Sequence, residues 1–497
     1  MLRKLAIGAA AALTLTMVTA PAADAAAKPD LAQLVTVKEI KQHLQNLQTI
    51  GDYNGGNRAA GLPGFEISVK YVVNELKKAG LSPTVQKFEF DYWAEKSPAV
   101  FAQTAPGQVT YTPDTDFSTY QYSGSGDVTA AAVPVDVPTT VEDGTSGCEA
   151  ADFANFPKGS IALIQRGGCD FAVKAANAKA AGAVGSVIFQ KPTVEDSPVG
   201  GTLGAPFDQP VVGPTFKIGN ELVKLANGGG VKLHLKTDTE AGKRQASNVI
   251  AESKYGDPNN VVVVGAHLDS VQAGPGINDN GSGTSTLLSL AKHINKLGKK
   301  GLKNKVRLAW WGAEEEGLLG SEHYVTTLSD AEKAKIALNL NFDMTASPNG
   351  VRGVYNGSDP TAPAGSAAIQ KIFNDYFAKR KLPTTPSEFN GRSDYGPFLE
   401  AGIPAGGIDT GAEGIKTAEE AKIFGGTAGK AYDGCYHQAC DRITNINWKL
   451  LDTNADGVAH AVQTLALSTL PVNGHALRAL PSLSAPSYEY KGGHLVR

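Results

Sequence analysis

The spacing of apolar residues near the start of the chain predicts two helices followed by a strand. Residues 37–47 and 66–78 place apolar side chains at helical intervals, and a glycine-rich polar loop at 55–57 separates them. Residues 84–90 alternate between apolar and polar positions, which is typical of a strand with one buried face. We expect this segment to open an α/β layer.

From residue 246 onward, unbroken apolar runs alternate with helical patterns. The runs are bounded by turn signals and span residues 261–266, 306–312, 336–342 and 403–408. Residues 284–297 show one of the helical patterns between them. Strands of a parallel sheet read as continuous apolar runs because helices bury both of their faces. The pattern therefore predicts an α/β fold with a mainly parallel sheet covered by helices on both faces.

The composition changes between these two regions. Residues 97–242 are rich in Val, Thr, Gly, Asp and Pro, which predicts a mainly β unit, and one helix is expected in it at residues 171–181. A chain of 497 residues is also too long for one ordinary core. We expect a main unit made of residues 28–96 and 243–475, interrupted by the β unit. A flexible tail is expected at residues 482–497.

The N-terminal residues have the pattern of a secretory signal. Met-Leu-Arg-Lys precedes an apolar stretch at 5–18, and Ala23-Asp24-Ala25 follows it, which predicts a signal peptide at residues 1–25. The apolar stretch is too short to span a bilayer comfortably. We therefore expect a secreted, extracellular protein that does not bind a membrane.

The charge balance excludes a broad basic surface. Lys and Arg total 46 against 49 Asp and Glu, giving a formal net charge of −3. A nucleic-acid partner is therefore not expected, since no positive field is available to hold a polyanion. We take the protein to be a monomer.

The cysteines agree with an exported protein. Cys148, Cys169, Cys435 and Cys440 form an even set, which favours disulfides in an oxidising compartment. Three pairings can be drawn. We expect Cys148 to pair with Cys169 and Cys435 with Cys440, because local pairing closes the shortest loops.

Side chains of metal-binding types follow three of the predicted buried strands. In chain order they are His267 and Asp269 after the first strand, Asp279 in the loop beyond, Glu314 and Glu315 after the second strand, and Asp343 after the third. An α/β sheet places its active site at the carboxyl ends of its strands, so these side chains are expected to converge. Singly, each has a structural explanation as a packed histidine, a turn or a helix start. Together they crowd charge that costs free energy unless a cation compensates it.

The ligand types indicate which metal is bound. Imidazole mixed with carboxylate oxygen favours zinc, whereas an all-oxygen site favours calcium or magnesium. The candidates also outnumber the ligands that one catalytic zinc takes when it keeps a position open. We therefore expect two Zn²⁺ per chain, and an aspartate in the glycine-rich loop could bridge them.

Two parts of the chain also resemble known families. The peptidase strings are Gly-Ala-His267-Leu-Asp269-Ser, Gly-Ile-Asn-Asp279-Asn-Gly-Ser-Gly, Trp-Trp-Gly-Ala-Glu314-Glu315, Leu-Asn-Phe-Asp343-Met and Cys-Tyr436-His437-Gln-Ala-Cys. They occur in family order and resemble the exported double-zinc aminopeptidases of bacteria, from about residue 30 to 470. Residues 159–171 and 181–189 resemble the protease-associated domain that is inserted in several exported peptidases. The resemblance implies peptide substrates and large apolar N-terminal residues.

The resemblance also implies a role for each matching residue. Asp279 would bridge the two zinc ions. His267 and Asp343 would complete the shell of one ion, and Glu315 and His437 that of the other.

Further matching residues would act beside the metals. Glu314 would be the general base, Tyr436 would donate its phenol to the oxyanion, and Asp269 would hold the His267 imidazole in its ligating tautomer. Arg392, in a string matching residues near the substrate site, would help to hold the amino end of the peptide. A Cys435–Cys440 bridge would clamp the loop of Tyr436 and His437.

A second metal signal is weaker. Asp452-Thr-Asn-Ala-Asp456-Gly begins like a calcium loop but has Gln463 where a closing glutamate is required. Some relatives use aspartates matching Asp30, Asp452 and Asp456 for a structural calcium. The alternative is an acidic helix start.

Three other functions fit parts of the pattern. A carboxypeptidase has the same core and a similar insertion. A cyclase that closes N-terminal glutamine uses one zinc on the same scaffold. A non-catalytic receptor is the alternative of another class, although the chain keeps the whole ligand set and the candidate base.

Overall fold

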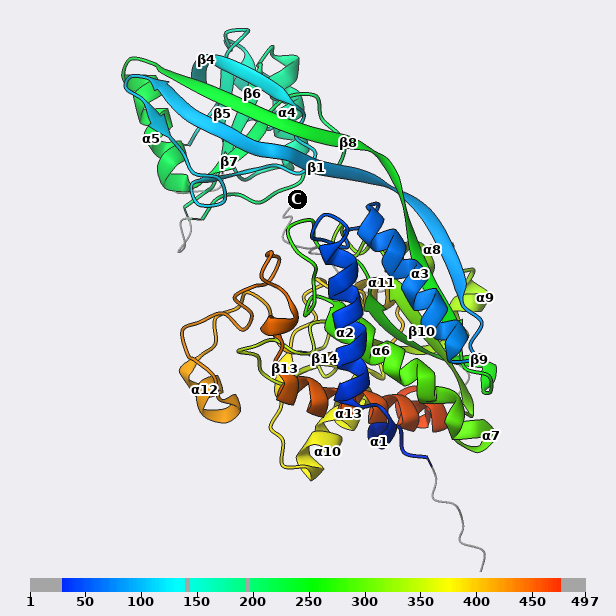
Figure 1. Ribbon diagram of the computed structural model, residues 1–497. Helices are drawn as coiled ribbons and strands as arrows, with labels where there is room; N and C mark the ends of the chain where they lie inside the picture. Colours follow the sequence, from blue (N-terminus) through cyan, green and yellow to red (C-terminus); the bar gives the residue numbers. More distant parts are fainter. Residues whose placement is uncertain (1–28, 139–143, 193–196, 475–497) are drawn as a thin grey trace, which may run out of the picture.

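The computed structural model describes residues 29–138, 144–192 and 197–474, which form two bodies joined by a long pair of strands (Figure 1). The lower body in Figure 1 contains most of the helices, and the upper body is smaller and mainly β. The predicted signal peptide at 1–25 and the predicted tail at 482–497 lie outside the described residues.

The lower body is built on a sheet with the strand order β13-β12-β14-β11-β9-β10-β8. The bounds are Thr385–Ser387 (β13), Gly353–Tyr355 (β12), Ala405–Asp409 (β14), Ile336–Phe342 (β11), Asp257–His267 (β9), Asn304–Trp311 (β10) and Val231–Glu252 (β8). Strands β14, β11, β9 and β10 pair in parallel, whereas β8 pairs antiparallel with β10. The mainly parallel sheet predicted from the apolar runs is confirmed.

Helices cover both faces of this sheet. Val262 and Val264 of β9 belong to the larger core, and Val261 and Val263 belong to a separate core on the opposite face. The first face is packed by α2 (Val37–Asp52), α3 (Pro63–Lys78), α6 (Gly281–Ile294), α10 (Ser366–Lys379) and α13 (Trp448–Leu467), and the second by α8 (Leu319–Thr327) and α11 (Gly396–Glu400). The two cores follow from the period of two in β9, since successive side chains of a strand point to opposite faces.

Short helices fill the connections. Their bounds are Leu31–Leu34 (α1), Gly298–Gly301 (α7), Asp330–Lys333 (α9), Ala418–Phe424 (α12) and Leu470–Asn473 (α14), with 3₁₀ turns at Ala150–Phe153 (η1), Asn295–Leu297 (η2) and Ile443–Asn445 (η3).

Helix boundaries follow their capping residues. Thr36 caps α2 by accepting a hydrogen bond from the backbone N–H of Glu39, and Asn280 caps α6 by accepting from Gly283. Pro63 occupies the first turn of α3, where a missing N–H costs nothing. Helices α3 and α6 therefore begin three residues before the positions that the apolar spacing alone predicts.

The upper body contains one helix more than the sequence predicted. Its strands are Val109–Thr110 (β2), Phe117–Thr119 (β3), Gly126–Pro134 (β4), Ile161–Gln165 (β5), Gly185–Phe189 (β6) and Val211–Pro214 (β7), and its helices are α4 (Phe171–Ala180) and α5 (Phe216–Gly228). The prediction of a single helix was wrong, because residues 216–228 also form a helix, with Ile218 and Leu222 on its buried face. A Cβ at Gly219 would lie 2.1 Å from the Phe189 ring, so glycine permits close packing there and does not end the helix.

Two long strands connect the bodies. Strand β1 (Thr84–Ala105) pairs antiparallel with β8 from Thr84↔Ile250 to Ala105↔Lys232. The predicted domain borders, at residues 96/97 and 242/243, fall inside these continuous strands. The upper body is thus carried on a ribbon that begins as part of the sheet of the lower body (Figure 1).

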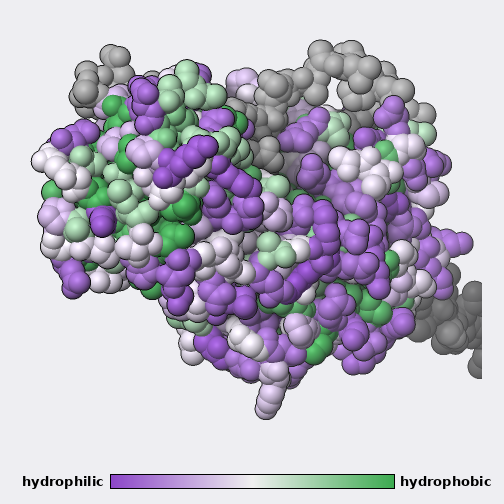
Figure 2. Space-filling view, turned by 90° about the horizontal axis from the view of Figure 1, so that it is seen from above, coloured by the Kyte–Doolittle hydropathy of each residue, from purple (hydrophilic) through white to green (hydrophobic). Residues whose placement is uncertain are grey.

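The faces that the two bodies present from above differ in character. Seen from above, the upper body, at the left of Figure 2, shows more apolar side chains than the lower body beside it. Val109 and Val173 of the inserted body are 44% and 41% exposed. Within the described ranges, no helix combines the length and apolarity needed to cross a bilayer.

Candidate metal centre

Asp279 lies between two histidines at the carboxyl ends of the central strands. Its Oδ1 is 3.2 Å from Nε2 of His267, and its Oδ2 is 3.0 Å from Nε2 of His437. His267 ends β9, whereas His437 comes from a loop far along the chain. One carboxylate therefore presents an oxygen to each imidazole, as a residue that bridges two cations must.

Three further carboxylates surround this pair. Asp343 Oδ1 and Glu314 Oε2 lie 3.3 and 3.9 Å from Nε2 of His267, and Glu315 Oε2 lies 3.0 Å from Nε2 of His437. Glu314 and Glu315 follow β10, and Asp343 follows β11. The metal ligands predicted from the sequence are thus all brought together at one edge of the sheet.

Two triplets of ligand atoms lie close enough to share an ion. Within each, the atoms are no more than 4.8 Å apart, and the triplets are His267, Asp279 and Glu315, and His267, Glu314 and Asp343. His437 stands outside both triplets but contacts Asp279 and Glu315 directly. The two oxygens of the Asp279 carboxylate therefore lie between one half of the cluster around His267 and the other around His437.

The cluster leaves polar atoms unsatisfied in a way that a cation would correct. His267 Nε2, Glu315 Oε1 and Asp343 Oδ1 are buried and have no hydrogen-bond partner among the described residues. The 3.2 Å contact from His267 to Asp279 lacks hydrogen-bond alignment. Buried polar atoms are rarely left unpaired, so these atoms fit metal ligands.

The electrostatics of the cluster point the same way. Although burial disfavours the imidazolium, the carboxylates of Asp343 and Glu314 raise the pKa of His267 well above its usual value. Burial likewise opposes charging of His437, but Glu315 and Asp279 raise its pKa to about 10. Burial raises the pKa of Glu314, although the charge of His267 acts in the opposite direction. Without a metal, the carboxylates stabilise the protonated histidines. Divalent cations bound at the cluster would supply this positive charge instead.

Asp269 fixes the backbone that carries the two glutamates. Its carboxylate accepts hydrogen bonds from the N–H groups of Glu314 and Glu315, each at 3.2 Å. Nδ1 of His267 lies 3.2 Å from the backbone carbonyl of Asp269 and 3.7 Å from its carboxylate. The backbone carbonyl of Asp269 is therefore the nearer acceptor for the His267 imidazole. The Asp269 carboxylate instead fixes the backbone that follows β10.

Asp441, which the sequence analysis did not single out, supports the bridging residue. It accepts hydrogen bonds from the N–H groups of Asn278 and Asp279, at 2.8 and 2.9 Å. Asp433 in turn accepts from the side-chain amides of Asn278 and Asn445. Asp441 directly follows the second cysteine of the Cys-Tyr-His-Gln-Ala-Cys string, and this position was the only available signal.

Arg58 is a second supporting residue that no motif contains. It is fully buried and donates to the carbonyls of Leu268, Pro275 and Gly276, at both ends of the loop before Asp279. Burial lowers its pKa to about 10 even though Asp269 and other nearby carboxylates oppose this. The guanidinium of Arg58 thereby places a positive charge close to the acidic cluster and holds the loop before Asp279.

Tyr436 and Arg392 meet beside the cluster. The guanidinium of Arg392 donates to the Tyr436 hydroxyl at 3.2 Å and pairs with Glu413 at 2.6 Å. Burial raises the pKa of Tyr436 well above its usual value, so its phenol keeps the proton that a donor needs. The predicted Cys435–Cys440 and Cys148–Cys169 disulfides are both confirmed, and the first closes the loop of Tyr436.

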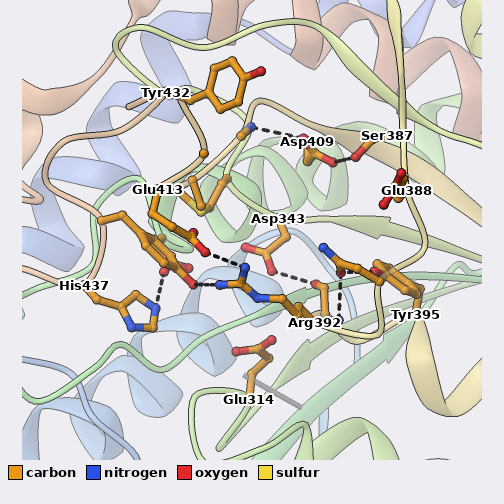
Figure 3. A pocket seen from close by; sticks show the side chains of 18 of the residues that line it. Glu314, Asp343, Ser387, Glu388, Arg392, Tyr395, Asp409, Glu413, Tyr432 and His437 are labelled. Atoms are coloured by element: carbon orange, nitrogen blue, oxygen red, sulfur yellow. Dashed lines mark hydrogen bonds and ion pairs between the residues drawn. The ribbon is translucent and has the colours of Figure 1, made fainter. Parts of the chain in front are cut away.

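A cavity of about 280 Å³ adjoins the cluster and shares its residues (Figure 3). Glu388, Asp409 and Glu413 add further carboxylates to its wall. Among the described lining residues, only Arg392 and His437 can carry positive charge. The cavity is therefore suited to a substrate group with a positive charge, such as a free amine.

Comparison with known proteins identifies the family. The sequence profile of Peptidase family M28 matches residues 248–462. The chain is 46% identical to an aminopeptidase of Pseudomonas aeruginosa, over 89% of this chain and 83% of that protein. The chain belongs to peptidase family M28. It is also 41% identical to a probable leucine aminopeptidase 2 of Aspergillus fumigatus, over 88% of this chain and 85% of that one.

Solved M28-like structures share the fold. An aminopeptidase from Aneurinibacillus sp. strain AM-1 matches with a TM-score of 0.67 and 26% identity, over 87% of this chain and 94% of that one. A zinc aminopeptidase from Bacillus subtilis matches with a TM-score of 0.60 and 26% identity, over 87% and 95%. The PA domain profile matches residues 128–222, within the inserted body. The protein is a metallo-aminopeptidase with an inserted PA domain.

The three aspartates expected at a calcium site lie near one another. Burial, together with the charges of Asp452 and Asp30, raises the pKa of Asp456 to about 6. Asp452 and Asp456 are one turn apart on α13, and Asp30 accepts the backbone N–H of Ala32 at the start of α1. Among the described residues, no triplet of ligand atoms within 4.8 Å includes them.

We expect Asp441→Ala to weaken metal binding while the fold is retained. The substitution leaves the N–H groups of Asn278 and Asp279 without their acceptor, and loss of such a support lowers metal affinity by about 10-fold to 100-fold. Affinity for Zn²⁺ would be measured by competition with a chelator.

Asp375→Ala provides the matched control, because Asp375 is exposed on α10 and forms a surface ion pair with Lys371. Equal Zn²⁺ affinity in the two variants would show that Asp441 does not hold the site.

Proposed function

We propose that the protein is a two-zinc aminopeptidase that releases the N-terminal residue of peptides. The observation that carries the proposal is the Asp279 carboxylate, which presents one oxygen to His267 and the other to His437. His267 and Asp343 would complete the shell of one ion, and Glu315 and His437 that of the other. Mixed imidazole and carboxylate donors suit zinc.

When bound, the two zinc ions supply Lewis acidity that lowers the pKa of a water and polarises the scissile carbonyl. Glu314 is the general base. Although its oxygen lies close enough to His267 and Asp343 to share an ion with them, it is the farthest of three carboxylates from His267 Nε2, at 3.9 Å against 3.2 and 3.3 Å for Asp279 and Asp343. Glu314 takes the proton of the attacking water and returns it to the leaving amide nitrogen.

Tyr436 stabilises the oxyanion that forms on the carbonyl. Its protonated hydroxyl faces the cavity, and Arg392 donates a hydrogen bond to the phenol oxygen and so orients it. A donor fixed in this way needs no reorganisation when negative charge develops. Arg392 therefore acts on the oxyanion through Tyr436, and its pairing with Glu413 argues against the direct grip on the peptide that the resemblance implied.

The charge of the cavity favours an aminopeptidase over the carboxypeptidase alternative. A C-terminal carboxylate would enter a cavity lined by carboxylates whose arginine is already paired with Glu413. A free N-terminal amine would instead be attracted there. Met344, Tyr355 and Tyr432 provide the bulky walls that a large N-terminal side chain requires. The retained ligand set and base argue against a binding-only receptor, and two metal positions argue against the one-zinc cyclase.

Two further proposals concern the setting of the enzyme. We infer that the enzyme is exported and acts on extracellular peptides, since its two disulfides are typical of oxidising compartments. We also propose that Asp30, Asp452 and Asp456 hold a structural Ca²⁺ that ties α1 to α13, since the charges of Asp452 and Asp30 already raise the pKa of Asp456. A monomer remains our expectation.

We predict that the enzyme cleaves peptides from the amino end. We expect release of leucine from leucine p-nitroanilide and from peptides with free amino termini, and no release from N-acetylated peptides. An N-blocked peptide ending in glutamate serves as the carboxypeptidase substrate. Cleavage of that peptide, with none of the anilide, would contradict the proposal.

The second prediction concerns the general base. Glu314→Gln keeps the shape of the side chain but cannot accept the proton, so turnover should fall by at least about 10²-fold. The metal content should stay unchanged. Glu322→Gln, on the exposed side of α8, is the matched control and should retain full activity. Near-normal turnover of Glu314→Gln would remove Glu314 from the mechanism.

A further inference from the structure

Asp409 stands next to a metal-site residue on the adjacent strand. Strands β11 and β14 are parallel and in register at Phe342↔Ile408, so Asp343, directly after β11, follows the same register pair as Asp409, the last residue of β14. Adjacent strands lie about 4.8 Å apart, and registered side chains point to the same face. Both carboxylates line the cavity beside the cluster (Figure 3). Asp409 is therefore one strand away from the site of bond cleavage.

The carboxylate of Asp409 has donors but no cation. It accepts hydrogen bonds from the Ser387 hydroxyl and from the N–H of Gly411. Burial raises its pKa, and the nearby Asp343 raises it further. No basic side chain of the described residues is among the groups that shift this pKa. A half-buried carboxylate without a cation is costly, and a positively charged guest would offset that cost.

The other charged residues of the cavity do not neutralise Asp409. Arg392 is held by Glu413 and Tyr436, and His437 contacts Asp279 and Glu315. Glu388 follows Ser387 at the exposed rim and adds another negative charge to this end of the cavity (Figure 3).

Apolar side chains line the space between the metal cluster and Asp409. Tyr355 is only 4% exposed and lies close enough to Asp409 and Asp343 for both charges to raise its pKa. Met344 follows Asp343 directly, and Tyr432 also interacts with the charge of Asp409. An aliphatic chain packed against these residues would end near the carboxylate. Lysine and arginine have this build, with an apolar stem and a charged end.

We propose that Asp409 is a specificity-determining residue, and that the subsite beside the metal cluster takes a long basic N-terminal side chain, lysine or arginine. This rests on the proposed N-terminal cleavage and refines the expectation of large apolar residues. The bulky walls accept the stem of the side chain, and Asp409 receives its charged end. The enzyme thus prefers lysine to an uncharged side chain with a similar stem.

The test compares lysine p-nitroanilide with norleucine p-nitroanilide, whose straight side chain resembles the lysine stem without the amine. We expect kcat/KM for the unmodified enzyme to be higher for lysine by about 10-fold or more, the usual worth of a hydrogen bond to a charged group. Asp409→Asn should lower this ratio by at least about 10-fold. Asp409→Glu, which keeps the charge, should retain a ratio above one.

Asp375→Asn, on exposed α10, is the matched control and should leave the ratio unchanged. A ratio of one or less for the unmodified enzyme would overturn the proposal, and this measurement needs no variant to fold. A high ratio that Asp409→Asn does not change would overturn the assignment of Asp409. Failure of both anilides to be cleaved would instead overturn the proposed aminopeptidase function.

Discussion

The structure depends on one crowded group of carboxylates at the edge of a parallel sheet. Asp279, Glu314, Glu315 and Asp343 lie within a few ångströms of two imidazoles and are shielded from water. Such crowding is unfavourable without compensating positive charge. The surrounding hydrogen bonds fix the backbone of these side chains and leave their inward oxygens available for cations.

The hydrogen bonds that fix the backbone of the cluster come from residues far apart in the chain. Asp441 accepts a hydrogen bond from the N–H of Asp279, and Asp269 accepts hydrogen bonds from those of Glu314 and Glu315. Arg58 donates to carbonyls of the loop before Asp279. None of these contacts involves the atoms that face a metal. The site is therefore pre-organised by its backbone, which is the arrangement expected where ligands must be in place before substrate binds. The same concentration of negative charge extends into the cavity through Asp409, which is the basis of the proposed preference for basic N-terminal side chains.

Much of the site could be predicted from the sequence because its ligands follow recognisable apolar strands. His267, Asp343 and the glutamates each stand directly after a run that became β9, β11 or β10. Arg58 and Asp441 could not be predicted, since they act on residues more than 150 positions away and belong to no spacing pattern. Asp409 stands directly after the run at residues 403–408, so the same signal was present there, but no family string contains it.

The fold shows the same division between local and distant signals. Periodicity predicted α2, α3 and the parallel strands, whereas α5 was missed although its apolar residues fall at helical spacing in a segment of otherwise β-like composition. The antiparallel ribbon of β1 and β8 was likewise hidden, because each strand is stabilised by a partner more than a hundred residues away. Local rules thus identify the elements, and long-range packing decides their ends.

The most direct test of the account is the zinc content of the purified protein after equilibration with Zn²⁺ and removal of free metal. The bridging position of Asp279 predicts two zinc ions per chain, and His437→Ala should reduce the content to one. A content of one or none in the unmodified protein, or two in His437→Ala, would contradict the two-metal centre.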